Sequence, residues 1–293
     1  MADFVASRRI GEAIVTVISD GTLRWAPKFQ ISEEERRRAM PDSGEDGRLT
    51  LGLNLAHVRL GEASIVIDPG CDAPSSAWAA EFAAKWPGLT RTLGLDAALR
   101  RIDEAPEAVT HVLITHAHED HFAGVAGERG ADLVLRFPNA RHVIGRRDWE
   151  EHPARSQPES ALVRRLGLAA RRGLLETVGE ARDIAPGVAM IPAPGETAGH
   201  CIVRVASGGR RFYYLGDLFH VPCEIEHVEW APPNRDVSSL ISSRRALLAD
   251  AVPHDSVLVF SHDSFPAWGR ITRAGNGYRW HRDEEEAGAG FTS

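Results

Sequence analysis

The stretch that decides how this chain folds is Thr115-His116-Ala117-His118-Glu119-Asp120-His121. It places three imidazoles and two carboxylates within six residues, directly after the apolar run 111–114. Imidazole nitrogen and carboxylate oxygen are ligands that zinc and similar divalent metals prefer. In a loop or a first helical turn, this spacing directs some of the side chains to one point and the others to a second point nearby. The stretch therefore suits two metal ions better than one.

An ordinary polar loop at the end of a strand is the alternative interpretation. That interpretation suits the isolated histidines of the chain, which are His57, His142, His152 and His281. It does not suit five adjacent ligand side chains, because packing them without a metal ion would crowd like dipoles and charges together. The stretch 115–121 therefore predicts a metal site.

Three more polar side chains follow or interrupt apolar strand patterns further along the chain. His200 follows the turn 194–199, Asp217 follows the run 213–216, and His262 follows the run 259–261. A polar residue at a strand end is ordinary when it is taken singly. Taken in order after the first cluster, however, the three complete a recognisable ligand pattern.

The distribution of apolar residues predicts strands and helices along the whole chain. Strands are expected at 13–18, 51–60, 63–67, 111–114, 188–191, 201–205 and 212–215, with a last core strand at 257–260; helices are expected at 33–38, 93–103 and 237–251. Strands followed by helices, twice over, favour a single layered α/β domain over residues 1–293. Within it we expect a helical insertion at about 150–182 and a frayed tail at about 283–293.

Composition limits the class of protein. Hydrophobic residues make up 43% of the 293 residues and charged residues 26%, which excludes a disordered chain. The net charge of −7 argues against a nucleic-acid partner. Charges occupy the positions where a signal peptide would need apolar residues, and no apolar run approaches the roughly 18 residues of a membrane span. The odd number of cysteines, three, suggests no disulfide framework. We therefore expect a cytoplasmic protein without a membrane partner.

The ordered ligand pattern resembles the metallo-β-lactamase-fold hydrolase superfamily, whose HxHxDH motif is met at residues 116–121. The resemblance implies an α/β fold, a four-layer αββα sandwich in which two mixed β-sheets pack face to face with helices outside. It also implies two divalent metal ions, zinc first, with manganese, cobalt or iron as alternatives. The implied metal ligands are His116, His118 and His200 for the first ion, Asp120, His121 and His262 for the second, and Asp217 as the bridge. Asp68 matches the buried aspartate that orients a ligand histidine.

The branch of the superfamily is indicated by further motifs. Asp217 points away from true β-lactamases, which lack the bridging aspartate. The C-terminal runs 261–271 and 277–280, together with the run 216–218, look like the branch of methyl-parathion-hydrolase-type enzymes and N-acyl-homoserine lactonases. Glyoxalase-II-like thioesterases and mononuclear iron persulfide dioxygenases share much of the ligand set and stay open as alternatives.

This branch implies a quorum-quenching type of lactonase that cleaves a small-molecule lactone or ester by attack of a metal-bridging hydroxide. A phosphotriesterase activity is the alternative or a side reaction. Asp217 and Asp120 are the implied catalytic carboxylates, with Asp120 also a proton shuttle. His220 occupies the position where several lactonases carry a tyrosine, so it is either a hydrogen-bond donor to the substrate or a wall residue. A homodimer is expected on the resemblance alone.

Aromatic residues near the predicted ligands are candidates for the wall of an apolar substrate pocket. They are Phe122, Trp149, Phe219, Trp230, Phe265 and Trp268. Because aromatic residues also dominate protein cores, we expect at least half of them to belong to the core instead.

Overall fold

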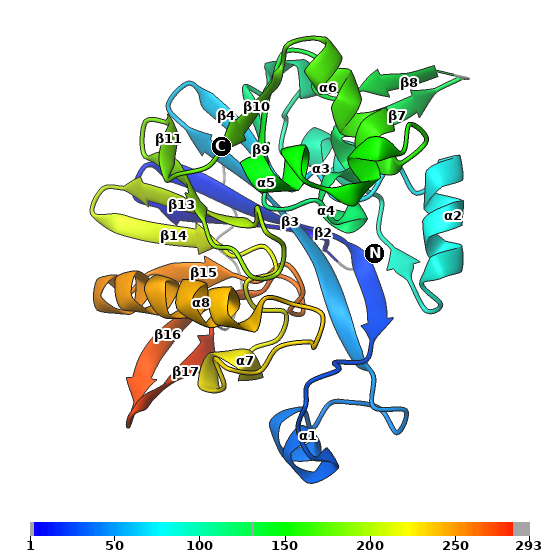
Figure 1. Cartoon of the computed structure of the whole chain (residues 1–293). Coiled ribbons are helices and arrows are strands. Elements are labelled where there is room, and N and C mark those ends of the chain that lie inside the picture. The colour runs from blue at the N-terminus through cyan, green and yellow to red at the C-terminus, as the bar shows by residue number, and fades with distance from the viewer. Residues whose placement is uncertain (1–2, 131, 284–293) are drawn as a thin grey trace.

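The computed structural model describes residues 3–130 and 132–283, and within them two β-sheets pack face to face (Figure 1). The first sheet runs in the order β1 (Val5–Ile10), β2 (Ala13–Trp25), β3 (Leu49–Leu60), β4 (Ala63–Ile67), β6 (His111–Ile114), β9 (Arg141–Gly145) and β10 (Leu175–Val178), with β5 (Thr90–Arg91) beside β2. Its β1–β4 part is antiparallel, whereas β4, β6, β9 and β10 are parallel to one another. The sheet is therefore mixed, as expected.

The second sheet is mixed as well. Its order is β11 (Arg182–Ala185), β12 (Val188–Pro192), β13 (Cys201–Ser207), β14 (Arg210–Tyr214), β15 (Val257–Val259), β16 (Trp268–Ala274) and β17 (Gly277–Arg282). β14 and β15 are parallel, and the other neighbours are antiparallel. A separate hairpin pairs β7 (Ala126–Arg129) with β8 (Asp132–Leu135).

Helices cover the outer face of each sheet, which completes the four layers. The α-helices are α1 (Glu33–Ala39), α2 (Ala77–Lys85), α3 (Leu95–Arg101), α4 (Glu119–Phe122), α5 (Arg146–Glu150), α6 (Gly167–Arg171), α7 (Cys223–Glu226) and α8 (Val237–Ala251). Short helical turns lie at Pro106–Ala108, Ala123–Val125, Pro153–Ser156, Leu162–Leu166 and Val252–His254. In Figure 1, α8 lies across the second sheet and α1 stands away from both sheets. No helix in the described part of the chain has the length and hydropathy that a membrane crossing needs.

The alternation of side chains along the strands explains the layers. In β4, Ile65 and Ile67 point into the core between the sheets, whereas Val66 between them packs with Leu99 of α3 on the outer face. A strand buried on both faces in this way reads as a continuous apolar run, because successive side chains point to opposite faces. The same alternation occurs in β13. Val203 faces the core between the sheets, whereas the residue before it faces outward and packs with α8.

The carboxyl ends of four central strands lie at one edge of the sandwich and carry the predicted ligands. Asp68 follows β4, the stretch 115–121 follows β6, Asp217 follows β14 and His262 follows β15. β4 and β6 are parallel neighbours, and so are β14 and β15, so that each pair ends on the same side. His200 joins them because it immediately precedes β13, which is antiparallel to β14.

Three sequence expectations about the elements were wrong. β2 does not end at residue 18 but continues to Trp25, with a bulge between Ser19 and Gly21 that absorbs the expected turn. The insertion at about 150–182 is helical only between 153 and 171, because 175–178 pairs with β9 as strand β10. The strand at 257–259 is not the last, since the β16–β17 hairpin follows it. The expected frayed tail after residue 283 lies outside the described residues.

Candidate metal centre

Asp68 holds the loop that carries the first ligand cluster. Its carboxylate accepts hydrogen bonds from Thr115 N at 2.7 Å and Thr115 Oγ1 at 2.8 Å, and from His121 Nδ1 at 2.8 Å. The side chain is fully buried, and its backbone has a φ of 51°, in the left-handed region that aspartate tolerates better than most residues. Asp68 therefore fixes both ends of the stretch 115–121, in the role that the resemblance implies for it.

The first group of ligand atoms gathers around His116. His116 Nε2 lies 2.8 Å from His118 Nδ1 and 3.6 Å from Asp217 Oδ2. Glu196 joins these three residues, so that one ligand atom from each lies within 4.8 Å of all the others. His116, Glu196 and Asp217 are buried, whereas His118 is partly exposed.

A second group lies next to the first and consists of Asp120, His121 and His262. Asp120 Oδ2 is 3.7 Å from His121 Nε2 and 3.8 Å from His262 Nε2. His262 is oriented from behind, because its Nδ1 donates a hydrogen bond to the carbonyl oxygen of Gly52 at 2.9 Å. That bond leaves Nε2 facing the centre.

Asp217 lies between the two groups. Its Oδ1 is 3.2 Å from His121 Nε2 and 3.2 Å from His262 Nε2, in the second group. Its Oδ2 is 3.6 Å from His116 Nε2, in the first group. One carboxylate thus reaches both groups, which is the arrangement that a bridging ligand requires.

The donor atoms fit metal ions, because several of them are buried and make no hydrogen bond among the described residues. His121 Nε2, Asp217 Oδ1 and Glu196 Oε1 accept or donate no hydrogen bond among the described residues. Buried polar atoms without a partner are costly, and a cation at each group would satisfy them. The mixture of imidazole nitrogen and carboxylate oxygen suits zinc, manganese, cobalt or iron.

Electrostatics supports the same conclusion. Burial acts to lower the pKa of His121, yet the surrounding carboxylates, Asp217 first, raise that pKa well above its usual value. Burial acts to raise the pKa of Asp217, yet His121 and the neighbouring imidazoles hold it well below its usual value. The pocket of carboxylates thus attracts positive charge strongly, and a divalent cation supplies such charge.

His200 lies beside the first group of ligand atoms. Its Nδ1 donates to the carbonyl oxygen of Ala193 at 3.0 Å, and its Nε2 accepts from the backbone N–H of Asp217 at 3.0 Å. The ring lies beside His116, with 5.2 Å between ring centroids, but His200 belongs to neither ligand group. Gly216 permits this position, because its φ is +52° and a Cβ there would lie 2.7 Å from His200 Nε2.

Glu196 is the residue of the centre that sequence reasoning missed. It lies in the turn 194–199, four residues before His200, and a single glutamate in a turn carries no signal of its own. Its Oε1 is 3.7 Å from His118 Nδ1 and 3.8 Å from His220 Nε2. Arg235 pairs with it from the other side.

His220 packs at the inner wall of the centre. Its ring stacks on Trp25 at 5.3 Å and on His262 at 5.7 Å, and its Nε2 lies 3.3 Å from Asp217 Oδ2. Burial acts to lower the pKa of His220, but Glu196 and Asp217 raise it to about 9. Its backbone N–H donates to Glu224, so that both ring and backbone are held.

The six predicted aromatic residues lie in different places. Phe122 lines the cavity described below. The structure places Phe219 and Trp268 in the core instead, where both are almost fully buried, because their strand and loop positions point them inward. Trp149 packs in the core under the guanidinium of Arg155. Phe265 packs against the core between the sheets, and Trp230 stacks on His227 beside a separate hollow.

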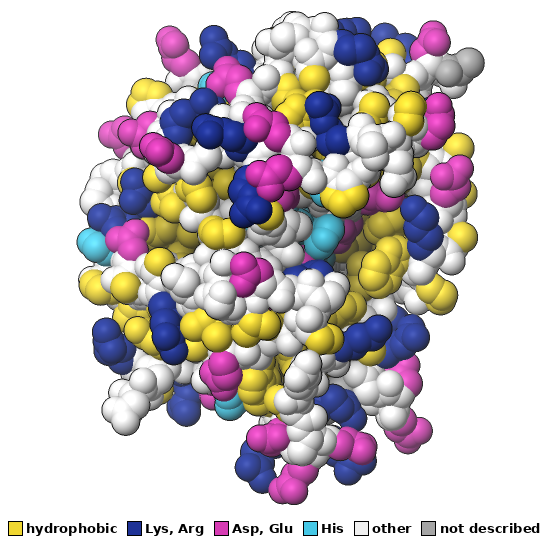
Figure 2. Space-filling view, viewed as in Figure 1, with side chains coloured by type: hydrophobic (Ala, Val, Ile, Leu, Met, Phe, Trp, Pro, Cys, Tyr) yellow, Lys and Arg dark blue, Asp and Glu magenta, His cyan; other side chains and the backbone are white. Residues whose placement is uncertain are grey.

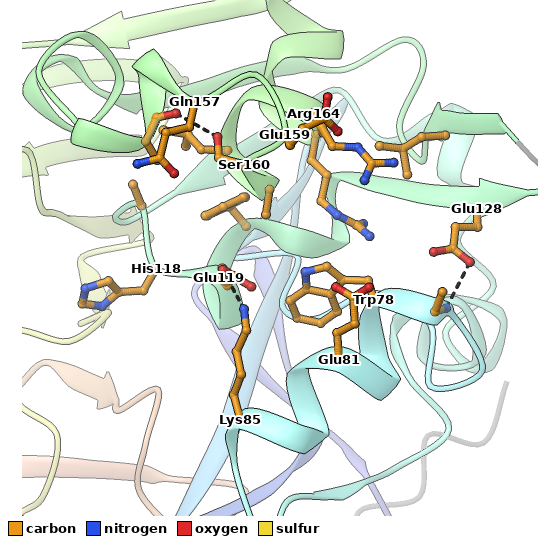
Figure 3. A pocket seen from close by; sticks show the side chains of 18 of the residues that line it. Trp78, Glu81, Lys85, His118, Glu119, Glu128, Gln157, Glu159, Ser160 and Arg164 are labelled. Atoms are coloured by element: carbon orange, nitrogen blue, oxygen red, sulfur yellow. Dashed lines mark hydrogen bonds and ion pairs between the residues drawn. The ribbon is translucent and has the colours of Figure 1, made fainter.

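A cavity of about 620 Å³ opens beside the first ligand group (Figure 3). His118 lies at one end of it, and the ion pair of Lys85 with Glu119 lies between His118 and Trp78 in that view. Phe122 and Leu162 add apolar lining. Figure 2 shows histidine at a hollow near the middle of the molecular face, with hydrophobic side chains beside it.

A sequence model described as the metallo-β-lactamase superfamily matches residues 56–262. Two probable metallo-hydrolases, one of Mycobacterium bovis and one of Mycobacterium tuberculosis, are each 28% identical to the chain over 144 residues. That match covers 44% of this chain and 44% of each relative, so the chain spans less than half the length of these relatives.

Solved structures share the fold over nearly the whole chain. AidC, described as a dizinc quorum-quenching lactonase, is 20% identical with a TM-score of 0.76 over 96% of this chain and 98% of its own. The hydrolase AbOPH, described as in the β-lactamase superfamily, is 20% identical with a TM-score of 0.79 over 98% and 99%. A probable metal-dependent hydrolase from Staphylococcus aureus is 19% identical with a TM-score of 0.78 over 95% and 99%. At such identities the likeness shows the fold alone.

Proposed function

The chain belongs to the metallo-β-lactamase superfamily, as a metal-dependent hydrolase, and on this premise we propose that it is a dinuclear-metal lactonase. The observation that carries the proposal is the position of Asp217, whose two oxygens reach both ligand groups within 3.6 Å. A single carboxylate between two groups of ligands suits two cations that share it.

The residues that would hold the ions come from both groups. His116 and His118 would hold one ion, with His200 added by the family resemblance; Asp120, His121 and His262 would hold the other, and Asp217 would serve both. When bound, such ions supply a nucleophile at neutral pH, because coordination lowers the pKa of water to about 7, and they polarise a substrate carbonyl. No serine or cysteine nucleophile is required.

The protein's own side chains then have separate tasks. The Asp120 side chain is 18% exposed and that of Asp217 only 4%, so Asp120 is the carboxylate that can pass a proton to a departing alkoxide. His220 is better suited to positioning, because it is buried between Trp25 and His262 and its Nε2 faces Asp217. His220 therefore helps to hold the Asp217 carboxylate in position.

The cavity supports a neutral ester with an apolar portion as the substrate. Trp78, Phe122 and Leu162 supply apolar wall in the same cavity as His118. Its acidic lining residues, Glu81, Glu119, Glu128, Asp132 and Glu159, outnumber the basic residues Lys85, Arg164 and Arg165. An acidic lining disfavours a polyanionic substrate such as a phosphate monoester or nucleic acid. An acyl-homoserine lactone is neutral and carries an apolar chain, so it fits both features.

One preparation tests the proposal in two ways. Metal content by mass spectrometry is expected to give two divalent ions per chain, with zinc, manganese, cobalt or iron as candidates. Hydrolysis is then measured on a long-chain acyl-homoserine lactone, a γ-lactone, an aryl ester, an aryl phosphotriester and a glutathione thioester. Lactone turnover well above the others is the expected result.

Other results would replace the proposal with a named alternative. Two metals with the triester dominant would indicate an organophosphate hydrolase, and thioester turnover would indicate a glyoxalase-II-like enzyme. One iron with oxygen uptake would indicate a persulfide dioxygenase. The homodimer expected from the resemblance stays a prediction, which light scattering of the same preparation measures.

A further inference from the structure

We propose that Glu196 is a ligand to the metal ion of the His116–His118 group and that Arg235 holds its carboxylate in place. This inference rests on the proposed metal centre and extends it by a residue to which the family resemblance assigns no role. It concerns the ligand set of this particular chain.

The spacing of the donor atoms supports a shared ion. In a tetrahedral zinc site, ligand atoms about 2.1 Å from the ion lie about 3.4 Å from one another. Here His118 Nδ1 is 2.8 Å from His116 Nε2 and 3.7 Å from Glu196 Oε1, and His116 Nε2 is 3.6 Å from Asp217 Oδ2. These separations bracket the expected value, and all four atoms lie within 4.8 Å of one another.

The two oxygens of the Glu196 carboxylate have different contacts. The side chain has no solvent exposure. Oε2 accepts a hydrogen bond from Arg235 Nε at 2.5 Å, whereas Oε1 is ion-paired with Arg235 Nη2 but lacks a well-directed hydrogen bond among the described residues. Oε1 is also the oxygen that faces His118. A buried carboxylate oxygen aimed at two imidazoles is a suitable site for a cation.

The loop that carries Glu196 is tied directly to the loop of the histidine ligands. Asp148 accepts hydrogen bonds from Ala117 N at 2.9 Å, Thr197 Oγ1 at 2.7 Å and Gly199 N at 2.7 Å. One buried carboxylate therefore sets the distance between the 115–121 loop and the 194–200 loop. The residues that follow Glu196 are thus anchored to Asp148, and Arg235 holds its carboxylate.

His200 lies beside the group and uses both ring nitrogens in hydrogen bonds, to the carbonyl oxygen of Ala193 and from the backbone N–H of Asp217. Glu196 Oε1, from the same loop, makes no hydrogen bond among the described residues and would add a donor atom to the group. The competing explanation is that Glu196 serves only as the ion-pair partner of Arg235.

Two variants separate these explanations because they predict opposite changes. In Glu196→Gln the amide is a poorer ligand, so zinc binds more weakly at the His116–His118 group. In Arg235→Met the carboxylate loses its cationic partner, so the metal-free protein is less stable and the metal ion becomes the main partner of Glu196. Ligand binding raises the Tm in proportion to its free energy, so the zinc-induced rise in Tm reports both effects.

The experiment measures the Tm of the metal-free and zinc-loaded forms of wild type, both variants and the control Glu81→Gln, which changes a glutamate at the cavity rim. We expect the zinc-induced rise to shrink in Glu196→Gln and to grow in Arg235→Met, with the control equal to wild type. Competition with a chelator is expected to show zinc affinity at least about tenfold weaker in Glu196→Gln. The absorption spectrum of the Co²⁺-loaded form is expected to change in this variant as well.

A zinc-induced rise, a zinc affinity and a cobalt spectrum equal to wild type in Glu196→Gln would overturn the ligand role, whatever Arg235→Met does. A wild-type protein that binds fewer than two zinc ions would instead contradict the proposed function, so the two failures are distinct. If Glu196→Gln does not fold, Glu196→Asp is tested in its place. Its shorter side chain keeps the negative charge but moves the carboxylate oxygen away from the proposed ion. The same loss of zinc affinity is expected from it, and its absence overturns the inference.

Discussion

The imidazole of His121 donates a hydrogen bond from Nδ1 to Oδ2 of Asp68 over 2.8 Å, and this bond turns its Nε2 toward Asp217, 3.2 Å away. Asp68 lies at the end of β4 and His121 in α4, after the neighbouring strand β6. The pairing of these two parallel strands therefore determines which nitrogen of His121 faces the centre. A carboxylate behind a ligand histidine fixes both its tautomer and its orientation.

Asp68→Asn is expected to weaken zinc binding by about 10- to 100-fold, because the amide no longer orients His121 as a ligand. It is also expected to cost about 1–3 kcal/mol of unfolding free energy, since the Thr115 N–H and hydroxyl lose a charged acceptor in a buried position. Chelator competition and urea denaturation measure the two effects. Asp183→Asn, at an exposed position of β11, is the matched control and should change neither. Unchanged zinc affinity in Asp68→Asn would contradict the orienting role.

Asp217→Ala and His121→Ala are each expected to abolish hydrolysis and to reduce the metal content below two ions per chain. The fold should be retained, because Asp217 lies in the loop after β14 and His121 in the short helix α4, and neither side chain belongs to the core between the sheets. Activity, metal analysis and far-ultraviolet circular dichroism check the three statements. His281→Ala, which removes an exposed histidine of β17, should behave as wild type. Wild-type kcat in a metal-replete Asp217→Ala sample would exclude the two-metal mechanism.

A tryptophan at the cavity wall is expected to discriminate between short and long acyl chains. Ala77 and Ala83 are both exposed on α2, but only Ala77 lines the cavity. Ala77→Trp should raise KM for a long-chain lactone by roughly tenfold, about 1.4 kcal/mol, and leave a short-chain lactone unaffected. Ala83→Trp should leave both unaffected. Equal KM values for the long-chain lactone in the two variants would show that the acyl chain lies elsewhere.

His142 is expected to make the fold sensitive to acid. It is fully buried in β9, and burial lowers its pKa to about 4, from 6.5 in an exposed histidine. Between these pH values the unfolded chain binds more protons, so stability falls as the pH falls from 6.5 toward 4, by about 2 kcal/mol at pH 5 for this group. His57, whose pKa burial also lowers to about 4, adds a similar loss.

His142→Leu should remove the contribution of one of these two histidines. At pH 7.5 the variant is expected to be as stable as wild type or slightly more so, because neither ring nitrogen of His142 has a hydrogen-bond partner among the described residues. Urea midpoints of both proteins at pH 7.5 and pH 5 give the comparison. If acidification destabilised the variant as much as wild type, His142 would not contribute to the acid sensitivity.

Much of the fold could be predicted because it depends on local patterns. The apolar runs at 63–67 and 111–114 predict buried strands, and the helix at 237–251 has the predicted bounds. Strand β10 falls within the predicted helical insertion, because its residues 175–178 show no clear period of two. Its identity depends on pairing with β9, which is a contact between distant parts of the chain.

The sequence by itself determined the ligand cluster at 115–121 and the order of the strand ends that carry Asp217 and His262, since ligand type and strand pattern are properties of short segments. Only the tertiary structure decided that Glu196 faces His118, with Arg235 behind it. It also decided which aromatic residues line the cavity and which fill the core. A side chain's chemistry is written in the sequence, but its partners depend on which distant strands and loops the packing of the two sheets brings together.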